Sequence, residues 1–97
     1  MLPKKRAPTH PGKILLKDFL EPMNITQKVF ATHIGWSYAR LNEIIHEKRG
    51  VSVESALDLA DVFKMEAQFW LNLQQNWDMW HAQKTHHRVK PIRIQAA

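Results

Sequence analysis

Two short helical segments joined by a turn carry the side chains best suited to chemistry by type and spacing. Gln27 begins the first segment, Gly35 lies in the turn, and Ser37 begins the second segment. Each helical residue advances by about 100°, so the second segment can bury Leu41 and Ile44 while it turns other residues outward. The outward residues are Ala39, Asn42, Glu43 and His46, with Tyr38 and Arg40 on the flanks. This pattern predicts a helix-turn-helix that presents its second helix to the major groove of DNA.

Several of these side chains match the edge of a DNA base. Arginine donates two hydrogen bonds to guanine, asparagine pairs with adenine, glutamate accepts from the amino group of cytosine, and alanine contacts the thymine methyl group. We therefore expect base contacts from Arg40, Asn42, Glu43 and Ala39. Each good pair of this kind discriminates between bases by about 1 to 3 kcal/mol.

Other residues of the same region are suited to the phosphate backbone. Gln27 can donate to a phosphate together with free backbone N–H groups at the start of its helix. Lys28, Lys48 and Arg49 can neutralise backbone charge. The full predicted set of DNA contacts is Gln27, Lys28, Ser37, Tyr38, Ala39, Arg40, Asn42, Glu43, His46, Lys48 and Arg49. The alternative is an ordinary helical bundle, in which the same two helices present a solvated face of mixed charge.

Positive charge is concentrated at the two ends of the chain. The formal net charge is +5. Residues 1–9 contain three cations and residues 81–97 contain four, and neither stretch contains an acid. The body between them is therefore mildly acidic, and residues 51–80 hold five acids against Lys64 alone. Basic ends are suited to nucleic acid or to solubility alone, and the acidic stretch suits either a basic protein partner or simple solvation.

Five helical segments must position these residues, over about 11–21, 26–35, 37–46, 52–63 and 66–83. No run of alternating apolar and polar residues is long enough for a buried strand. We therefore expect an all-α, five-helix, repressor-like DNA-binding domain that contains the helix-turn-helix. The predicted inner side of the first helix consists of Ile14, Leu16, Phe19, Leu20 and Met23.

The chain divides into three predicted parts. Residues 1–9 form a basic N-terminal arm, residues 10–83 form the helix-turn-helix domain with a C-terminal dimerisation helix, and residues 84–97 form a basic C-terminal tail. The arm, with Lys4, Lys5 and Arg6, either enters a minor groove or is disordered. The tail is either a short extended segment or mobile.

The fifth helical segment is rich in aromatic residues. A helix that is apolar around much of its circumference must bury two sides, and a second copy of a small chain can cover one of them. We predict a homodimer with an interface at Phe69, Trp70, Leu73, Trp77 and Trp80. The alternative is that these aromatic residues fold back onto the first and fourth helices.

Catalysis, cofactors and metals are not expected. The sequence contains no Cys, which excludes disulfides, thiolate zinc sites and cysteine nucleophiles. It also has no nucleophile-elbow or paired-histidine zinc motif, and His81, His86 and His87 are read as solvated side chains. No apolar stretch is long enough for a signal sequence or a membrane span. We therefore expect a cytoplasmic protein that has no membrane partner and is not an enzyme.

Specific motifs between about residues 8 and 82 resemble a known family. They are PTHPG at 8–12, FLEP at 19–22, TQ at 26–27, the turn with Ala31, Gly35 and Ser37, RG at 49–50, and FWLNLQ at 69–74. On these motifs the chain resembles the HigA (VapI-like) antitoxins of bacterial toxin–antitoxin modules. These antitoxins lie within the Cro/repressor-type (XRE) helix-turn-helix group.

The resemblance implies a homodimer that binds an operator in its own promoter and silences a small, HigB-like, mRNA-cleaving toxin. It assigns DNA contact to Gln27, Ser37, Tyr38, Ala39, Arg40 and Glu43, and it identifies no residue that contacts toxin. A stand-alone repressor without a toxin partner is the alternative. A dimer would place two recognition helices in major grooves about 34 Å apart, so the operator is expected to be an inverted repeat of double-stranded DNA.

Overall fold

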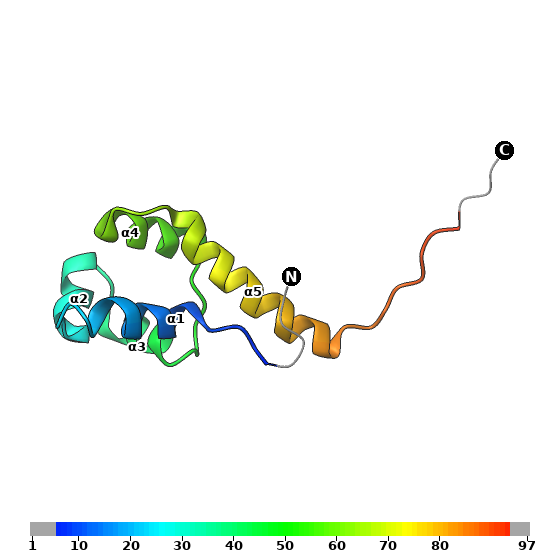
Figure 1. The fold of residues 1–97 in the computed structure, drawn as a ribbon, viewed down its shortest axis with the longest axis horizontal. Coiled ribbons are helices and arrows are strands. Elements are labelled where there is room, and N and C mark those ends of the chain that lie inside the picture. Colours follow the sequence, from blue (N-terminus) through cyan, green and yellow to red (C-terminus); the bar gives the residue numbers. More distant parts are fainter. Residues whose placement is uncertain (1–5, 94–97) are drawn as a thin grey trace.

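The computed structural model describes residues 6–93, and within this range the chain is helical with no strand. In chain order the helices are α1 (Pro11–Ile14), which continues directly into the π-helical η1 (Leu15–Leu20), then α2 (Gln27–Ile34), α3 (Tyr38–Ile45), α4 (Val53–Phe63) and α5 (Ala67–Thr85). Figure 1 shows α1, α2 and α3 lying below α4, with α5 sloping away from the end of α4. The prediction of an all-α, five-helix domain is confirmed. Lys4 and Lys5 of the predicted arm lie outside the described residues.

Three hydroxyl side chains fix the starts of α2, α3 and α4. Thr26 accepts from the backbone N–H of Val29 at 3.2 Å, and the Ser37 hydroxyl accepts from that of Arg40 at 3.0 Å. Ser52 caps α4 in the same way. Each cap satisfies a backbone donor that the helix itself leaves unpaired. Gly35 ends α2 with a φ of 82°, a conformation that costs glycine little.

The first helix departs from the predicted α-helical geometry in its second half. Over η1 the backbone bonds to the fifth residue back, as in the 2.9 Å bond from the Glu21 N–H to the Leu16 carbonyl. This wider turn changes the face that each residue presents, and Leu15 and Leu20 become fully buried. Met23 lies beyond the helix in a turn and is exposed. The prediction that Met23 belongs to the core is therefore wrong.

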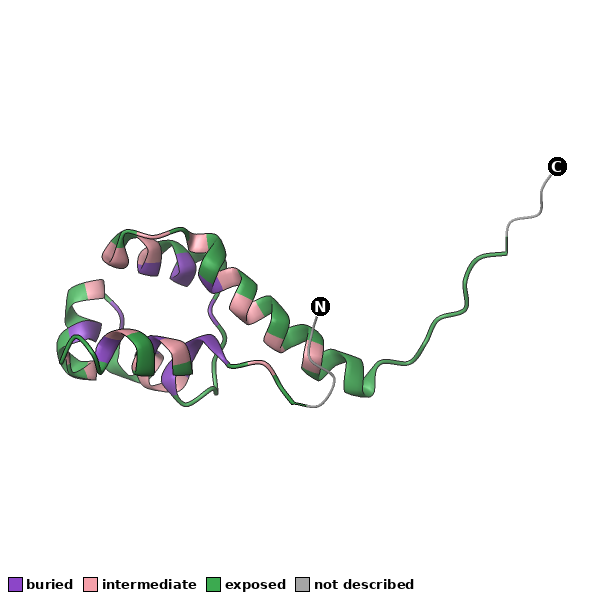
Figure 2. Ribbon diagram, in the orientation of Figure 1, coloured by how far each residue is buried: buried purple, intermediate pink, exposed green. Residues whose placement is uncertain are grey.

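Aromatic rings fill the space between the helices. Phe30 of α2 stacks on Phe63 of α4 with ring centroids 5.6 Å apart, and Phe19 lies 5.2 Å from Trp70 of α5. Trp70 is completely buried within the single chain. The prediction that Trp70 contacts a second copy is therefore wrong, because the core of its own chain already covers it. Figure 2 shows the buried residues on the inward sides of the helices and an exposed outer part of α5.

The first helix and α3 approach each other at backbone distance. A Cβ added to Gly12 would lie 1.8 Å from the carbonyl oxygen of Ile44. Glycine alone therefore allows this crossing. On the facing side of α3, Leu41 and Ile44 are fully buried, so the crossing fixes which side of α3 faces outward.

We expect Gly12→Ala to lower the free energy of unfolding by about 3 kcal/mol or more, because the new methyl group meets backbone that cannot move aside. Gly35→Ala is the matched control. Nothing lies within 4 Å of a Cβ at Gly35, so this change should cost about 1 kcal/mol, through backbone conformation alone. Urea unfolding of both variants measures the difference, and equal losses would contradict the close crossing.

Candidate nucleic-acid interface

The start of α2 and the outward side of α3 form one continuous surface. The Asn42 side-chain amide donates to the Gln27 side-chain oxygen at 3.2 Å and ties the two helices together. Tyr38 and Ala39 are exposed at the first turn of α3. Tyr38 lines a surface hollow with Thr26, Gln27 and Lys28. A hollow edged by a cation and by the free N–H groups of a helix start is suited to a phosphate group.

Arg40 is directed away from this surface. Its guanidinium lies over the Trp36 ring, 4.5 Å from the ring centroid, and it donates to the buried hydroxyl of Ser55 in α4. In this arrangement Arg40 joins α3 to α4 and does not face a base edge. The position of Arg40 on the flank of α3 brings it within reach of α4, and a contact with guanine would have to replace these two contacts, so that contact stays a prediction.

Trp36 explains why the guanidinium settles there. Its ring N–H donates to Asp58 of α4 at 2.8 Å, and the ring is buried against the core. Because this bond fixes the indole, Arg40 can pack on its face. A cation–π contact of this kind stabilises a fold by about 0.5 to 2 kcal/mol. Trp36, Asp58 and Ser55 thus form a polar cluster between the helix-turn-helix and α4 that was not predicted from the sequence.

Glu43 and Arg49 form an ion pair in the chain without DNA. The Arg49 guanidinium donates to the same Glu43 carboxylate oxygen through Nε at 2.9 Å and Nη2 at 2.8 Å. Both side chains are about half exposed. The pair neutralises an acid that would otherwise repel phosphate, and solvent screening leaves it weak enough to be exchanged. His46 is exposed, and its Nδ1 lies 2.8 Å from the Asn42 carbonyl oxygen.

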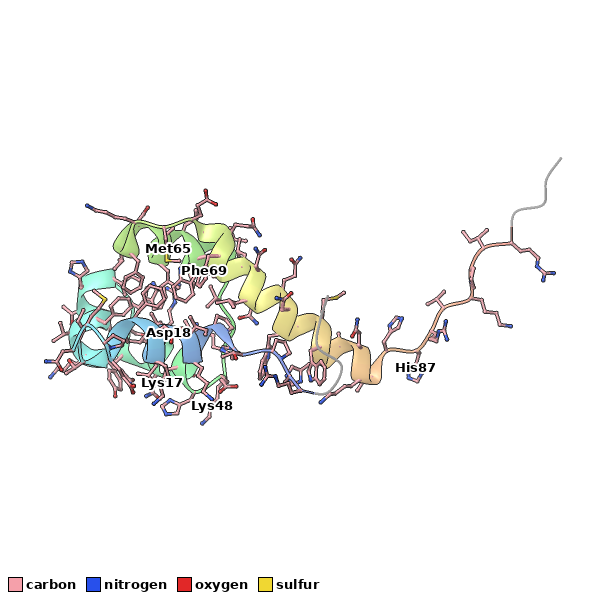
Figure 3. The ribbon with its side chains drawn as sticks, viewed as in Figure 1. Lys17, Asp18, Lys48, Met65, Phe69 and His87 are labelled. Carbon is pink, nitrogen blue, oxygen red and sulfur yellow. The ribbon has the colours of Figure 1, made fainter. Side chains whose placement is uncertain are left out.

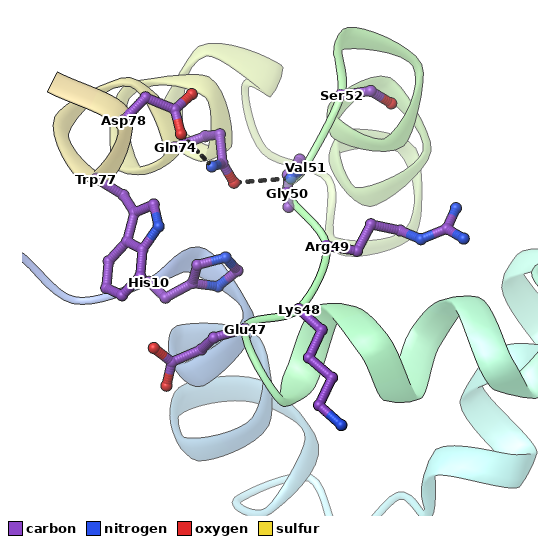
Figure 4. A pocket seen from close by; sticks show the side chains of 10 residues that line it. All are labelled: His10, Glu47, Lys48, Arg49, Gly50, Val51, Ser52, Gln74, Trp77 and Asp78. Atoms are coloured by element: carbon purple, nitrogen blue, oxygen red, sulfur yellow. Dashed lines mark hydrogen bonds between the residues drawn. The ribbon is translucent and has the colours of Figure 1, made fainter. Parts of the chain in front are cut away.

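A second hollow lies where the α3–α4 loop meets α5, between Glu47, Ser52, Gln74 and Asp78 (Figure 4). The Gln74 side-chain oxygen accepts from the Val51 N–H at 2.7 Å, and its amide donates to Asp78 at 2.9 Å. These bonds hold the loop that carries Lys48 and Arg49.

His10 closes the floor of this second hollow. It is buried, and its Nδ1 accepts from the backbone N–H of Gly12 at 2.9 Å, which caps α1. Its ring meets the Trp77 ring edge-on, with centroids 4.9 Å apart. Burial lowers the pKa of His10, and the nearby charges of Glu47 and Asp78 oppose that effect only in part. The structural roles of His10 and Gln74 were not predicted from the sequence, because the contact of His10 with Trp77 and that of Gln74 with Val51 each join distant segments.

The remaining residues of the predicted dimer stripe differ in how far they are buried. Leu73 is partly buried against the core, and Trp77 lies between His10 and His81. Trp80 is half-buried beneath Lys84. Phe69 is exposed. Within residues 6–93, no group of three or more His, Asp or Glu side chains is arranged to hold a metal ion.

Comparisons with known proteins agree with this geometry. Residues 16–70 match a family described as helix-turn-helix. Virulence-associated protein I of Dichelobacter nodosus is 36% identical over 83 residues, which cover 86% of this chain and 77% of that protein. Antitoxin HigA-1 of Vibrio cholerae is 33% identical over 93 residues, which cover 91% of this chain and 87% of that protein.

A solved structure of Pseudomonas aeruginosa antitoxin HigA with the higBA promoter has the same fold. It superposes with a TM-score of 0.80 at 33% identity, over 89% of this chain and 99% of that one. In the part of the chain that the structure describes, no helix has both the length and the apolar character needed to span a bilayer.

We expect the free energy of unfolding to decrease as the pH is lowered, because His10 is protonated more readily in the unfolded chain. Its pKa is lower in the folded than in the unfolded chain, so below the ordinary histidine value of about 6.5 the unfolded chain takes up a proton first. Stability is therefore full above that value and is lost as the pH falls from it toward the lower folded pKa. His10→Asn keeps a capping acceptor but does not titrate. Urea unfolding at two pH values, about 7.5 and 5, should show a smaller loss in the variant. An equal loss in both proteins would contradict this role.

Proposed function

The chain belongs to the XRE-type helix-turn-helix family that includes antitoxin HigA-1 and virulence-associated protein I, and we propose that it is the antitoxin of a toxin–antitoxin module. In this proposal it represses its own operon by binding operator DNA and silences a small, HigB-like, mRNA-cleaving toxin. The family is one of DNA-binding proteins, and we propose no enzymatic activity for this chain.

One observation carries the DNA-binding part of the proposal. The outward residues of α3 are held in place by a buried inner side and by the Gln27–Asn42 hydrogen bond. A solved relative that is 33% identical over almost its whole length has been determined with promoter DNA. We propose base contacts from Ala39, Asn42 and Glu43, with His46 and Tyr38 beside them. Phosphate contacts are proposed for Gln27, Lys28, Ser37, Lys48 and Arg49.

A homodimer remains part of the proposal, with a changed interface. Within the predicted stripe, Trp70 and Leu73 are used inside the chain. On α4, however, Val53 and Leu57 are 63% and 53% exposed, and they lie one turn apart. Val53 borders a shallow hollow between α4 and α5 that Leu71 also lines. We propose that a second copy covers this face, because a solvated apolar patch of this kind is costly.

We expect Asn42→Ala and Lys48→Gln to weaken DNA binding in different ways. Asn42→Ala should weaken the free energy of binding to the operator by about 1 to 3 kcal/mol and remove the preference for one base at a single base pair. The second should weaken binding to operator and unrelated DNA by a similar factor. Fluorescence anisotropy with a duplex taken from upstream of the gene measures both, and two chains should bind per duplex. A uniform loss from Asn42→Ala, or one chain per duplex, would contradict the respective proposal.

The antitoxin part is tested by co-expression with the adjacent open reading frame. Expression of that frame alone should arrest growth, and the full chain should restore growth and co-purify with its product. The acidic stretch at residues 51–80 supports such an interaction, since an RNA-cleaving enzyme needs a basic surface of its own. If no complex forms and growth is not restored, the antitoxin proposal fails and a stand-alone repressor is the function that survives.

A further inference from the structure

We propose that the basic segment at residues 84–93, named here the C-terminal arm, is a second DNA contact that binds phosphates beside the site read by α3. The proposal extends the DNA binding proposed above and rests on it. The arm lies outside the matched helix-turn-helix region, which ends at residue 70, so the helix-turn-helix match does not account for its charge.

The charge of the arm is of one sign. It carries Lys84, Arg88, Lys90 and Arg93, and the last acid of the sequence is Asp78. The two ion pairs of the described residues, Lys17–Glu21 and Glu43–Arg49, lie elsewhere. The arm therefore has a concentrated positive charge that its own chain does not neutralise, whereas the body of the molecule is mildly acidic.

The arm is extended and accessible. Residues 86–93 have no regular secondary structure, and all are exposed. Eight extended residues span about 26 Å, a length comparable to about eight base-pair steps of duplex DNA. The root of the arm is held at the last turn of α5, where the Lys84 ammonium lies over the Trp80 ring, 5.2 Å from its centroid. The cations can therefore follow a phosphate backbone while they stay attached to a folded helix.

The arm also starts on the appropriate side of the molecule. In Figure 1, α5 slopes from the level of α4 at its beginning to the level of α3 at its end. Figure 3 shows Lys17, Lys48 and, beyond the end of α5, His87 along the same lower side. In this view the root of the arm therefore lies toward the side of the molecule that carries Lys48, and the arm rises from there away from the helices.

Charge and backbone chemistry favour DNA over a protein as the occupant. A toxin that cleaves mRNA must attract phosphate and so would repel a basic arm. Pairing of the arm as an added strand is disfavoured by Pro91, which lacks a backbone N–H and interrupts the hydrogen-bond ladder. Val89 and Ile92 are almost fully exposed, and they provide a control for any apolar docking of the same segment.

The experiment compares the full chain with two variants on operator and unrelated duplexes over a range of salt concentrations. The first variant replaces the four cations (K84Q/R88Q/K90Q/R93Q), and the second keeps them but removes the apolar side chains (V89S/I92S). Each phosphate contact contributes about 0.9 to the slope of log affinity against log salt. If two cations per chain contact DNA, a dimer of the first variant should lose about 3 to 4 from that slope.

We expect the first variant to bind both duplexes at least about tenfold more weakly at physiological salt, with an unchanged preference for the operator. The second variant should bind as the full chain does. An unchanged slope in the first variant would overturn the proposal, as would an equal loss in the second. If the full chain showed no operator preference while the first variant still lost slope, the proposed function would fail and the arm contact would stand.

Discussion

The close crossing of the first helix over α3 is the constraint on which the rest of the structure depends. Gly12 brings the two backbones into contact at Ile44, and Leu41 and Ile44 are fully buried beneath them. An isolated helix of eight residues is unstable in water, since nucleation costs more than so few hydrogen bonds return. α3 therefore exists because its inner side is packed. The direction of its outer side is fixed by the same contact.

The features predicted from the sequence are those that depend on near neighbours. The caps at Thr26, Ser37 and Ser52 each bond to a backbone N–H three residues ahead. Gly35 needs only its own φ to end α2. Because these signals are local, the five helices and the turn between α2 and α3 can be predicted without knowing which helices pack against one another. The exposed face of α3 followed from helical periodicity alone.

The features that could not be predicted join distant segments. The hydrogen bond from Trp36 to Asp58 spans 22 residues, and the bond between Val51 and Gln74 spans 23. Periodicity places a residue on a helix face, but it does not state which side chain of another helix lies opposite. The contacts of Arg40 with Trp36 and Ser55 could not be predicted for this reason. The complete burial of Trp70 could not be predicted because an aromatic stripe is equally suited to a core and to an interface.

The described side chains also indicate where DNA affinity must originate. Asn42 and Glu43 already have partners inside the chain, so binding to a base exchanges one hydrogen bond for another, and its main effect is to discriminate between bases. These partners fix the rotamers and thus reduce the entropy lost on binding, which favours selectivity over strength. Strength in DNA binding comes mainly from neutralised phosphates. Lys28, Lys48 and Arg49 beside α3 can supply part of it, and since the body of this chain as a whole has more acids than bases, the cations at its ends can add to it.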